Sequence, residues 1–181
     1  EYRDVWRTQI ASAHIPTPMS AARKAPVSTL PLVGFIGQGF IGKNYADDFE
    51  RRGFSVVRYA LEEPYRQNKE KIKDCEIVFI AVPTPTTPRG FDDSIVEEAL
   101  GLIGSGKTAV IKSTILPGTT KRLYTRYPAI YVMHSPEFLV EATASYDASH
   151  PTRNIIGIPE ESGEMRTRAE AVLRVLPPAP F

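Results

Sequence analysis

The chain has 181 residues, which suits one main core with a small appendage, because compact domains cluster around ~100–150 residues. Hydrophobic residues make up 42%, charged residues 24%, and the formal net charge is +1, so charge gives no reason to expect a nucleic acid or an anionic membrane as partner. No apolar run approaches the roughly 18–20 residues that span a bilayer, and residues 1–10 lack the pattern of a signal peptide. We therefore expect a cytoplasmic protein whose partner is a small molecule.

Residues 1–31 contain several prolines among Ala, Ser and Thr, without a sustained helical or strand period. We interpret this stretch as a flexible arm or a tag-like extension. Met19 begins a plausible native start, so the residues before it are equally well interpreted as vector-derived or as an upstream linker. We assign no function to them.

From Leu32 onward, short apolar runs bounded by turn residues alternate with longer amphipathic stretches, which is typical of βαβ units. The predicted strands are Leu32–Ile36, Ser55–Tyr59, Glu76–Val82, Thr108–Lys112, Ile130–Met133 and Asn154–Ile158. The predicted helices are Ile41–Arg52, Tyr65–Lys73, Ser94–Gly104, Thr119–Tyr127 and Glu160–Leu176. The run from Ile77 to Val82 is apolar throughout, as in strands buried on both faces. We predict a Rossmann-type, doubly wound α/β domain over residues 32–176, with a mainly parallel sheet of about six strands and helices on both faces. Residues 177–181 would begin a linker to an absent C-terminal half.

A glycine-rich turn follows the first predicted strand and opens an amphipathic helix. Its sequence is Gly37-Gln38-Gly39-Phe40-Ile41-Gly42. In this context Gly37 permits a tight turn, Gly39 lets the backbone approach a pyrophosphate, and Gly42 lets the helix pack closely on the sheet. The pattern predicts a dinucleotide with its phosphates at the helix N-terminus.

The acidic residue that usually binds the adenosine ribose is missing, because the second strand should end near Ala60. Glu62 or Glu63 could reach the ribose from the loop, or Arg58 could favour a phosphorylated ribose. It is equally plausible that all three are solvated charges. We therefore expect NAD rather than NADP only as a preference.

Two further motifs follow predicted strands. The stretch Pro83–Pro88 is too rich in proline for a helix and should hold Thr84 and Thr86 in an extended loop, which could wall a cofactor or be a rigid connector. After the fourth strand, Ser113 and Thr114 place two hydroxyls at the strand end, although one of them could simply cap the next helix.

A pair of carboxylates follows the fifth strand. Glu137 and Glu141 are four residues apart, so both would share one face if the segment is helical. We interpret the neighbouring His134 as structural. Because the carboxyl ends of parallel strands meet at one edge of a sheet, we expect the glycine turn, proline loop, hydroxyls and carboxylates to surround one crevice.

Together these motifs resemble the N-terminal domain of the UDP-glucose/GDP-mannose dehydrogenase family, over about Leu32 to Gly157. The resemblance is carried by GFIGQGFIG, VPTPT, Asp92–Val96, KSTILPGTT, SPEFLVEA and Pro151–Gly157. It implies oxidation of the C6 alcohol of a nucleotide-bound hexose to a carboxylate, with two NAD molecules used in turn. UDP-glucose is the preferred substrate, and GDP-mannose is an alternative with which the Leu116-Pro117-Gly118 form of the hydroxyl motif is also compatible.

The resemblance also implies roles for individual residues. Thr114 would orient a catalytic water, and Glu137 would act as the acid/base. The cofactor would be held by Gly37, Gln38, Gly39, Phe40, Ile41, Gly42, Val82, Pro83, Thr84, Pro85, Thr86, Ser113 and Glu141. The substrate would be held by Glu137, Phe138, Leu139, Val140 and Glu141.

The chain departs from the family pattern in its length and in its thiol. The stretch Ala60–Lys73 is shorter than the corresponding stretch in the family. The family's thiol nucleophile, lysine and asparagine lie in a second half, beyond residue 181 of this chain. The helix through which the family dimerises lies there as well. The only cysteine, Cys75, precedes the third strand at its amino end, and no Cys/His cluster has zinc spacing, so we predict no metal. We expect this chain to bind NAD without sustained turnover. A non-catalytic nucleotide-binding module is the alternative.

Overall fold

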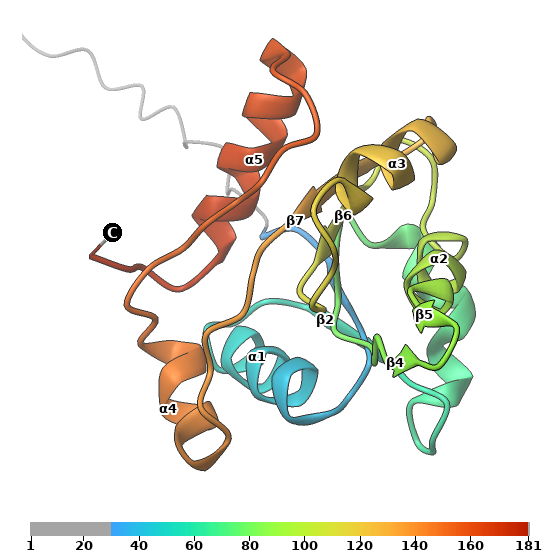
Figure 1. Ribbon diagram of the computed structural model, residues 1–181. Helices are drawn as coiled ribbons and strands as arrows, with labels where there is room; N and C mark the ends of the chain where they lie inside the picture. The colour runs from blue at the N-terminus through green and yellow to red at the C-terminus, as the bar shows by residue number, and fades with distance from the viewer. Residues whose placement is uncertain (1–29, 181) are drawn as a thin grey trace, which may run out of the picture.

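The computed structural model describes residues 30–180, so the predicted arm at residues 1–31 lies almost entirely outside the described part. Five parallel strands form a sheet in the order β2-β1-β3-β6-β7 (Figure 1). Their bounds are β1 Val33–Ile36, β2 Val56–Tyr59, β3 Ile77–Ile80, β6 Thr108–Ile111 and β7 Tyr131–His134. The chain passes from β1 to β2 on one side and then returns to β3 on the other, so the strand order reverses at β1. Ligands of open parallel sheets bind beyond the carboxyl ends of the strands at such a switch point.

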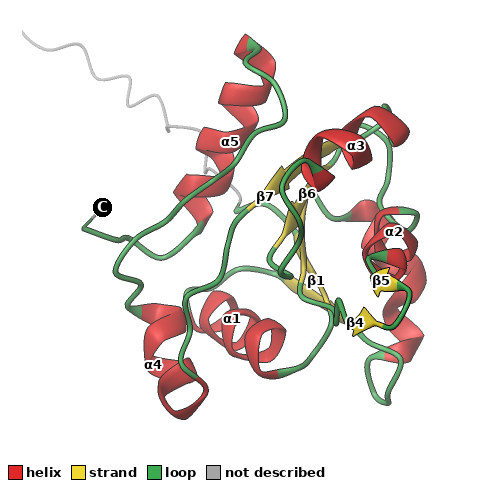
Figure 2. Ribbon diagram, in the orientation of Figure 1, coloured by secondary structure: helices red, strands yellow, loops and turns green. Residues whose placement is uncertain are grey.

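Helices cover both faces of the sheet (Figures 1 and 2). One face is covered by α1 Phe40–Arg51, α4 Ala144–Ser149 and α5 Gly163–Val175, and the other by the 3-10 helix η1 Arg66–Asp74, α2 Ser94–Leu100 and α3 Thr119–Arg126. Within β3, Phe79 packs with the first group of helices, whereas Val78 and Ile80 pack with the second. Both sides of the strand are therefore buried, which explains its uninterrupted apolar sequence. The predicted Rossmann-type α/β class is confirmed.

The sixth predicted strand, Asn154–Ile158, is not part of the sheet. Its only ladder contact is an antiparallel bridge between Gly157 and His134. His134 is the last residue of β7, so the segment meets that strand at its end and finds no further residues to pair with. Asn154 instead donates a hydrogen bond to the carbonyl of Pro177, at 2.7 Å. The sheet therefore has five strands rather than about six.

The predicted helices all form, with differences at their ends. α5 begins at Gly163 rather than Glu160, because the Ser162 hydroxyl accepts a hydrogen bond from the backbone N–H of Met165 and caps the helix. α2 ends at Leu100 rather than Gly104. The pattern did not predict α4, the 3-10 turn η2 Glu141–Thr143, or the hairpin of β4 Thr86–Thr87 and β5 Gly90–Phe91.

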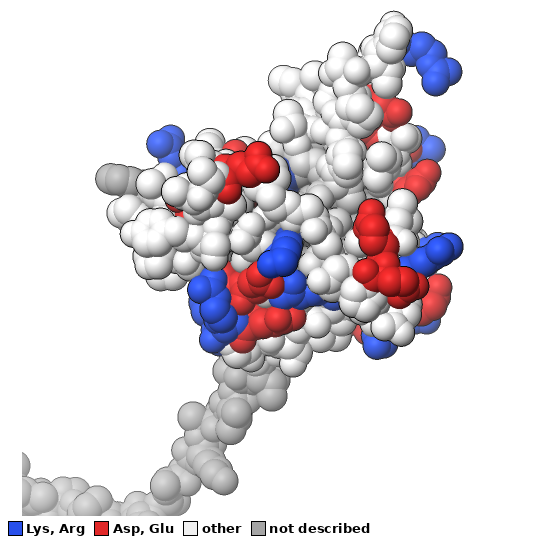
Figure 3. Space-filling model, turned by 90° about the horizontal axis from the view of Figure 1, so that it is seen from below, with Lys and Arg blue, Asp and Glu red and all other residues white. Residues whose placement is uncertain are grey.

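The charged surface is mixed in sign. Figure 3 shows basic and acidic side chains next to each other on one face, without a large area of a single sign. None of the helices within residues 30–180 combines the length and apolar character that crossing a bilayer requires. The same part of the chain contains no group of three or more His, Cys, Asp or Glu residues arranged to hold a metal ion.

Candidate functional site

The glycine turn has the geometry that its sequence predicts. Gly37 has a φ of +92°, and a Cβ atom there would collide with the carbonyl oxygen of Ala81 at the end of β3. A Cβ atom on Gly42 would collide with the carbonyl oxygen of Gly37, so α1 packs directly on the turn. At Gly39, the N-cap of α1, a Cβ atom would have nothing within 4 Å. Gly37 and Gly42 are therefore required by the fold, whereas Gly39 leaves space beside the helix N-terminus.

A cleft of about 870 Å³ opens at this edge of the sheet, which is within the usual range of 300–1,000 Å³ for ligand pockets. Three of the four predicted motifs line it. The lining includes Gly37, Gln38, Gly39, Phe40, Ile41, Val82, Pro83, Thr84, Ser113 and Thr114. Gly42 lies beneath the turn, and Pro85 and Thr86 lie outside the lining, since Thr86 belongs to the β4–β5 hairpin.

The hydroxyl of Ser113 and the backbone carbonyl of Thr114, which follow β6, hold the proline loop in place. Ser113 is buried, and its Oγ accepts a hydrogen bond from the N–H of Val82 at 3.0 Å and donates one to the carbonyl of Val82 at 2.7 Å. The hydroxyl of Thr84 donates to the carbonyl of Thr114 at 2.8 Å. Neither Ser113 nor Thr114 caps α3, whose N-cap is Gly118. The hydroxyl motif thus connects the carboxyl ends of β3 and β6.

The end of the cleft where the sequence predicts the ribose is formed by the last residue of β2 and the residues that follow it. Tyr59, Ala60, Leu61 and Glu62 line it, and Glu63 does not. Arg58 turns toward α1, where its guanidinium forms ion pairs of 2.7 Å with Asp47 and 2.8 Å with Glu50. Among the acidic candidates from the sequence, Glu62 is therefore the one at the cleft.

Glu137 lies in a second pocket of about 210 Å³. Two consecutive residues line the two cavities: Lys112 lines this pocket and Ser113 lines the large cleft. The second pocket is lined by Tyr45, Lys112, Ser135, Pro136, Glu137, Phe138, Leu139, Val140, Asp147, His150, Pro151, Thr152, Arg153, Asn154 and Ile155. Lys112 and Tyr45 were missed by sequence reasoning. A signal for Lys112 was present, since it is the one charged residue that directly ends a buried apolar strand.

The segment that follows β7 is extended rather than helical, so Glu137 and Glu141 do not share a helix face. Glu137 prevents a helix here by accepting hydrogen bonds from the backbone N–H groups of Phe138 and Leu139, at 2.7 and 2.9 Å. Glu141 is exposed at the start of η2 and lines neither cavity. His134 pairs through its backbone with Gly157, and burial lowers the pKa of its imidazole.

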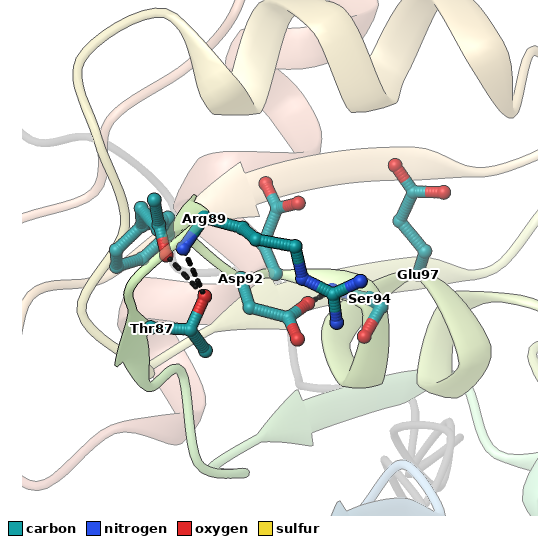
Figure 4. A pocket seen from close by; sticks show the side chains of 8 residues that line it. Thr87, Arg89, Asp92, Ser94 and Glu97 are labelled. Carbon is teal, nitrogen blue, oxygen red and sulfur yellow. Dashed lines mark hydrogen bonds between the residues drawn. The ribbon is translucent and has the colours of Figure 1, made fainter.

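A shallow third pocket lies beside the β4–β5 hairpin (Figure 4). Asp92 accepts a hydrogen bond from the N–H of Ser94 at 3.0 Å, which stabilises the first turn of α2. Asp93, the next residue of the motif, pairs with Arg122 of α3. Glu97, which also lines this pocket, pairs with Arg122 and Arg126 at 2.6 Å each. These contacts give the Asp92–Val96 motif a structural role in fastening α2 to α3.

The thiol of Cys75 is far from this edge of the sheet in the topology. Cys75 precedes β3 at its amino end and is fully buried within the hydrophobic core. Burial raises the pKa of its thiol to about 11, which keeps it protonated at neutral pH.

The sequence and the fold both match proteins of one known family. Residues 64–175 match the family model described as "UDP-glucose/GDP-mannose dehydrogenase family, NAD binding domain". A UDP-glucose 6-dehydrogenase from Streptococcus pneumoniae is 37% identical over 102 residues, covering 54% of this chain and 26% of that protein. A UDP-N-acetyl-D-mannosamine dehydrogenase from Methanococcus maripaludis is 30% identical over 121 residues, covering 61% of this chain and 28% of that protein.

Solved structures show the same relationship. A UDP-glucose dehydrogenase from the hyperthermophilic archaeon Pyrobaculum islandicum has a TM-score of 0.70 at 25% identity, over 86% of this chain and 46% of that one. The matched part of the chain thus spans about a quarter of the length of the two curated relatives. The match to an NAD binding domain confirms the predicted cofactor. Since the family model covers more than half of the sequence and the fold agrees, this chain belongs to the UDP-glucose/GDP-mannose dehydrogenase family, as its NAD binding domain.

Proposed function

We propose that the chain is the NAD binding part of a UDP-sugar 6-dehydrogenase that oxidises UDP-glucose to UDP-glucuronate through two successive hydride transfers. The observation that carries this proposal is the position of Glu137. Lys112 lines its pocket, and the next residue, Ser113, lines the large cleft. A proton acceptor beside a cofactor cleft is what oxidation of an alcohol requires.

The residues of the large cleft fit NAD. The open space at Gly39 and the N-terminus of α1 suit a pyrophosphate, since the unpaired N–H groups of the first helical turn favour anions. Val82, Pro83 and Thr84 would form the wall next to the glycine turn. When bound, NAD supplies the hydride acceptor.

The chain's own residues have distinct proposed roles. Glu137 accepts a proton from the substrate alcohol or from water, and Thr114, whose side chain is exposed at the end of β6, orients that water. Phe138, Leu139 and Val140 contact the sugar nucleotide from the loop that follows Glu137. The buried, protonated Cys75 does not supply a nucleophile, so the thiol step belongs to the remainder of the complete protein. Homodimerisation and a cytoplasmic location stay predictions.

The choice of UDP-glucose as the sugar rests on relatives. The two curated relatives compared above carry the names of UDP-sugar dehydrogenases, one acting on UDP-glucose and one on UDP-N-acetyl-D-mannosamine. These names favour a UDP-sugar over GDP-mannose.

Calorimetric titration tests the cofactor part of this proposal. We expect residues 1–181 to bind NAD more tightly than NADP. Gly39→Ala should weaken NAD binding at least tenfold while leaving the fold intact, because the new methyl group meets nothing but the space assigned to the ligand. Gly53→Ala is the matched control: Gly53 has a φ of +86° with open space around it and lies outside the cleft, so this variant loses stability and keeps its NAD affinity.

Activity of the complete protein tests the substrate part. We expect NAD reduction with UDP-glucose and little with GDP-mannose, and no sustained turnover by residues 1–181 alone. Equal binding of NAD by Gly39→Ala and the wild type would contradict the assigned cofactor cleft. Preferred oxidation of another nucleotide sugar would overturn the assignment of UDP-glucose.

A further inference from the structure

A buried group of polar side chains surrounds Glu137, and the proposed function does not use it. Lys112, which follows β6, places its ammonium 3.0 Å from Oε2 of Glu137. Tyr45 of α1 directs its hydroxyl at Oε1 of the same carboxylate, at 3.4 Å. The Lys112 ammonium also lies 4.5 Å from the centre of the Tyr45 ring. Glu137 is thus held by residues from two elements that are distant in sequence.

The two oxygens of the Glu137 carboxylate have different partners. Oε1 accepts from the backbone N–H groups of Phe138 and Leu139 as well as from Tyr45. Oε2 is buried and has no aligned hydrogen bond, and its neighbour is the Lys112 ammonium. The Lys112 ammonium is therefore the charged partner of this buried oxygen.

Lys112 is almost completely buried, with 3% of its side chain exposed. Its ammonium has the carbonyl and hydroxyl oxygens of Ser135 at 3.5 and 3.3 Å and the Glu137 carboxylate as acceptors, which matches its three N–H donors. Burying an ammonium is costly unless it is paired. The buried Lys112 ammonium is therefore placed to hold the neighbouring Glu137 carboxylate in position.

Other charged groups face the same pocket. Asp147 of α4 accepts a hydrogen bond from the N–H of Val140 at 3.1 Å, and so holds the end of the loop that Glu137 begins. His150 and Arg153 line the pocket, and Arg153 lies over the ring of Phe138. Asp48, on α1, acts electrostatically on Tyr45. Among these groups, Lys112 is the cation in direct contact with the carboxylate.

We propose that Lys112 and Tyr45 are positioning residues, which fix the Glu137 carboxylate and, through its bonds to Phe138 and Leu139, order the loop that contacts substrate. The part of this inference that concerns catalysis rests on the proposed function. The physical coupling of Lys112 to the loop does not, so it can be tested without turnover.

Amide hydrogen exchange in residues 1–181 tests the coupling. In Lys112→Met, we expect the N–H groups of Phe138 and Leu139 to exchange at least fivefold faster, relative to amides of β3 and β6, than in the wild type. Lys112→Arg should restore exchange to within about twofold. Tyr45→Phe, which removes only the hydroxyl, should give a smaller acceleration at the same two amides.

Arg52→Met is the matched control, because it removes one arginine partner of another buried carboxylate, Asp48, and neither residue lines this pocket or contacts Glu137. We expect it to change exchange generally and not selectively at Phe138 and Leu139. Unchanged relative exchange at these two amides in Lys112→Met would overturn the proposal. Should that variant not fold, unchanged exchange in Tyr45→Phe would overturn it instead.

Assays of the complete protein test the role of Lys112 in catalysis separately from its coupling to the loop. With UDP-glucose and NAD, Lys112→Met should lower kcat at least tenfold, change KM less than threefold and shift the acidic limb of the kcat profile to higher pH. A wild type that oxidises no nucleotide sugar would refute the proposed function, while the exchange data would still decide the coupling. An active wild type with an unaltered Lys112→Met variant would refute the positioning role.

Discussion

At the scale of residues, the buried ion pair between Lys112 and Glu137 influences the charge state of the Lys112 side chain. Burial lowers the pKa of the Lys112 ammonium, and the Glu137 carboxylate opposes that effect. Burial and the neighbouring carboxylate together raise the pKa of Tyr45, so its hydroxyl remains protonated and can donate at neutral pH. The charged form of Lys112 is therefore stabilised in the folded chain by the charged Glu137 carboxylate.

Replacing Glu137 by Gln should reveal this dependence through stability. Because the pKa of Lys112 is lower in the folded than in the unfolded chain, the unfolded chain binds more protons between the two values, and stability rises with pH there. Removing the carboxylate lowers the folded value further. We expect Glu137→Gln to lose about 3 kcal/mol of unfolding free energy at pH 7 and less as the pH approaches ~10.

Urea unfolding at pH 7 and 9.5 measures the two losses. Glu50→Gln serves as the control, since Glu50 is half exposed and pairs with an arginine that stays charged throughout this range. A loss for Glu137→Gln that is the same at both pH values would contradict the explanation.

At the scale of elements, α1 and β2 are joined by ion pairs that also affect the cofactor cleft. Partial burial alone would lower the pKa of Arg58, but its hydrogen bonds to Glu50 and Asp47 outweigh this and raise it. The guanidinium also lies 3.4 Å from the side-chain oxygen of Gln38, which lines the cleft. Arg58 is thus close to Gln38 at the edge of the cleft, and its charge is paired with two carboxylates of α1.

Releasing Arg58 from α1 should shift cofactor preference. We expect the double variant Asp47→Asn, Glu50→Gln to bind NADP several-fold more tightly than the wild type, because the guanidinium becomes available to a phosphate. Titration with NAD and NADP measures the change. Adding Arg58→Met to the double variant should return NADP affinity to the wild-type level, and an unchanged affinity in the double variant would exclude Arg58 from the ribose region.

At the scale of the whole molecule, the cleft is lined by elements that pack on both faces of the sheet. Its walls come from the ends of β1, β2, β3 and β6 and from α1 and α2, which pack on opposite faces of the sheet. A ligand that contacts all of these elements binds the folded chain and not the unfolded one. Binding should therefore stabilise the domain as a unit.

Thermal unfolding with added NAD tests this expectation. At a concentration of about 100 times Kd, the gain is about 2.7 kcal/mol, and Tm should rise by roughly 5–10 °C for a domain of this size. In Gly39→Ala the rise at the same concentration should be much smaller. An equal rise in both proteins would show that the stabilising ligand binds elsewhere.

Local patterning was sufficient to predict the five sheet strands, the helices between them and the glycine turn. Burial on both faces forces continuous apolar runs, and a turn at φ +92° with no room for a Cβ atom requires glycine. The same reasoning failed at Asn154–Ile158, where a largely apolar run pairs with β7 at a single residue, Gly157, and does not extend the sheet. Periodicity records which side chains are buried and does not record which backbone groups are paired.

Within the site, strand order alone predicted that Gly39, Thr84 and Thr114 would share a cleft, because carboxyl ends of parallel strands converge. The hydrogen bond of Tyr45 to Glu137, the ion pair of Glu137 with Lys112 and the turning of Arg58 toward α1 were decided by the tertiary structure. These interactions join residues up to 92 positions apart, and whether a charged side chain is paired or solvated depends on what the fold places within about 4 Å of it.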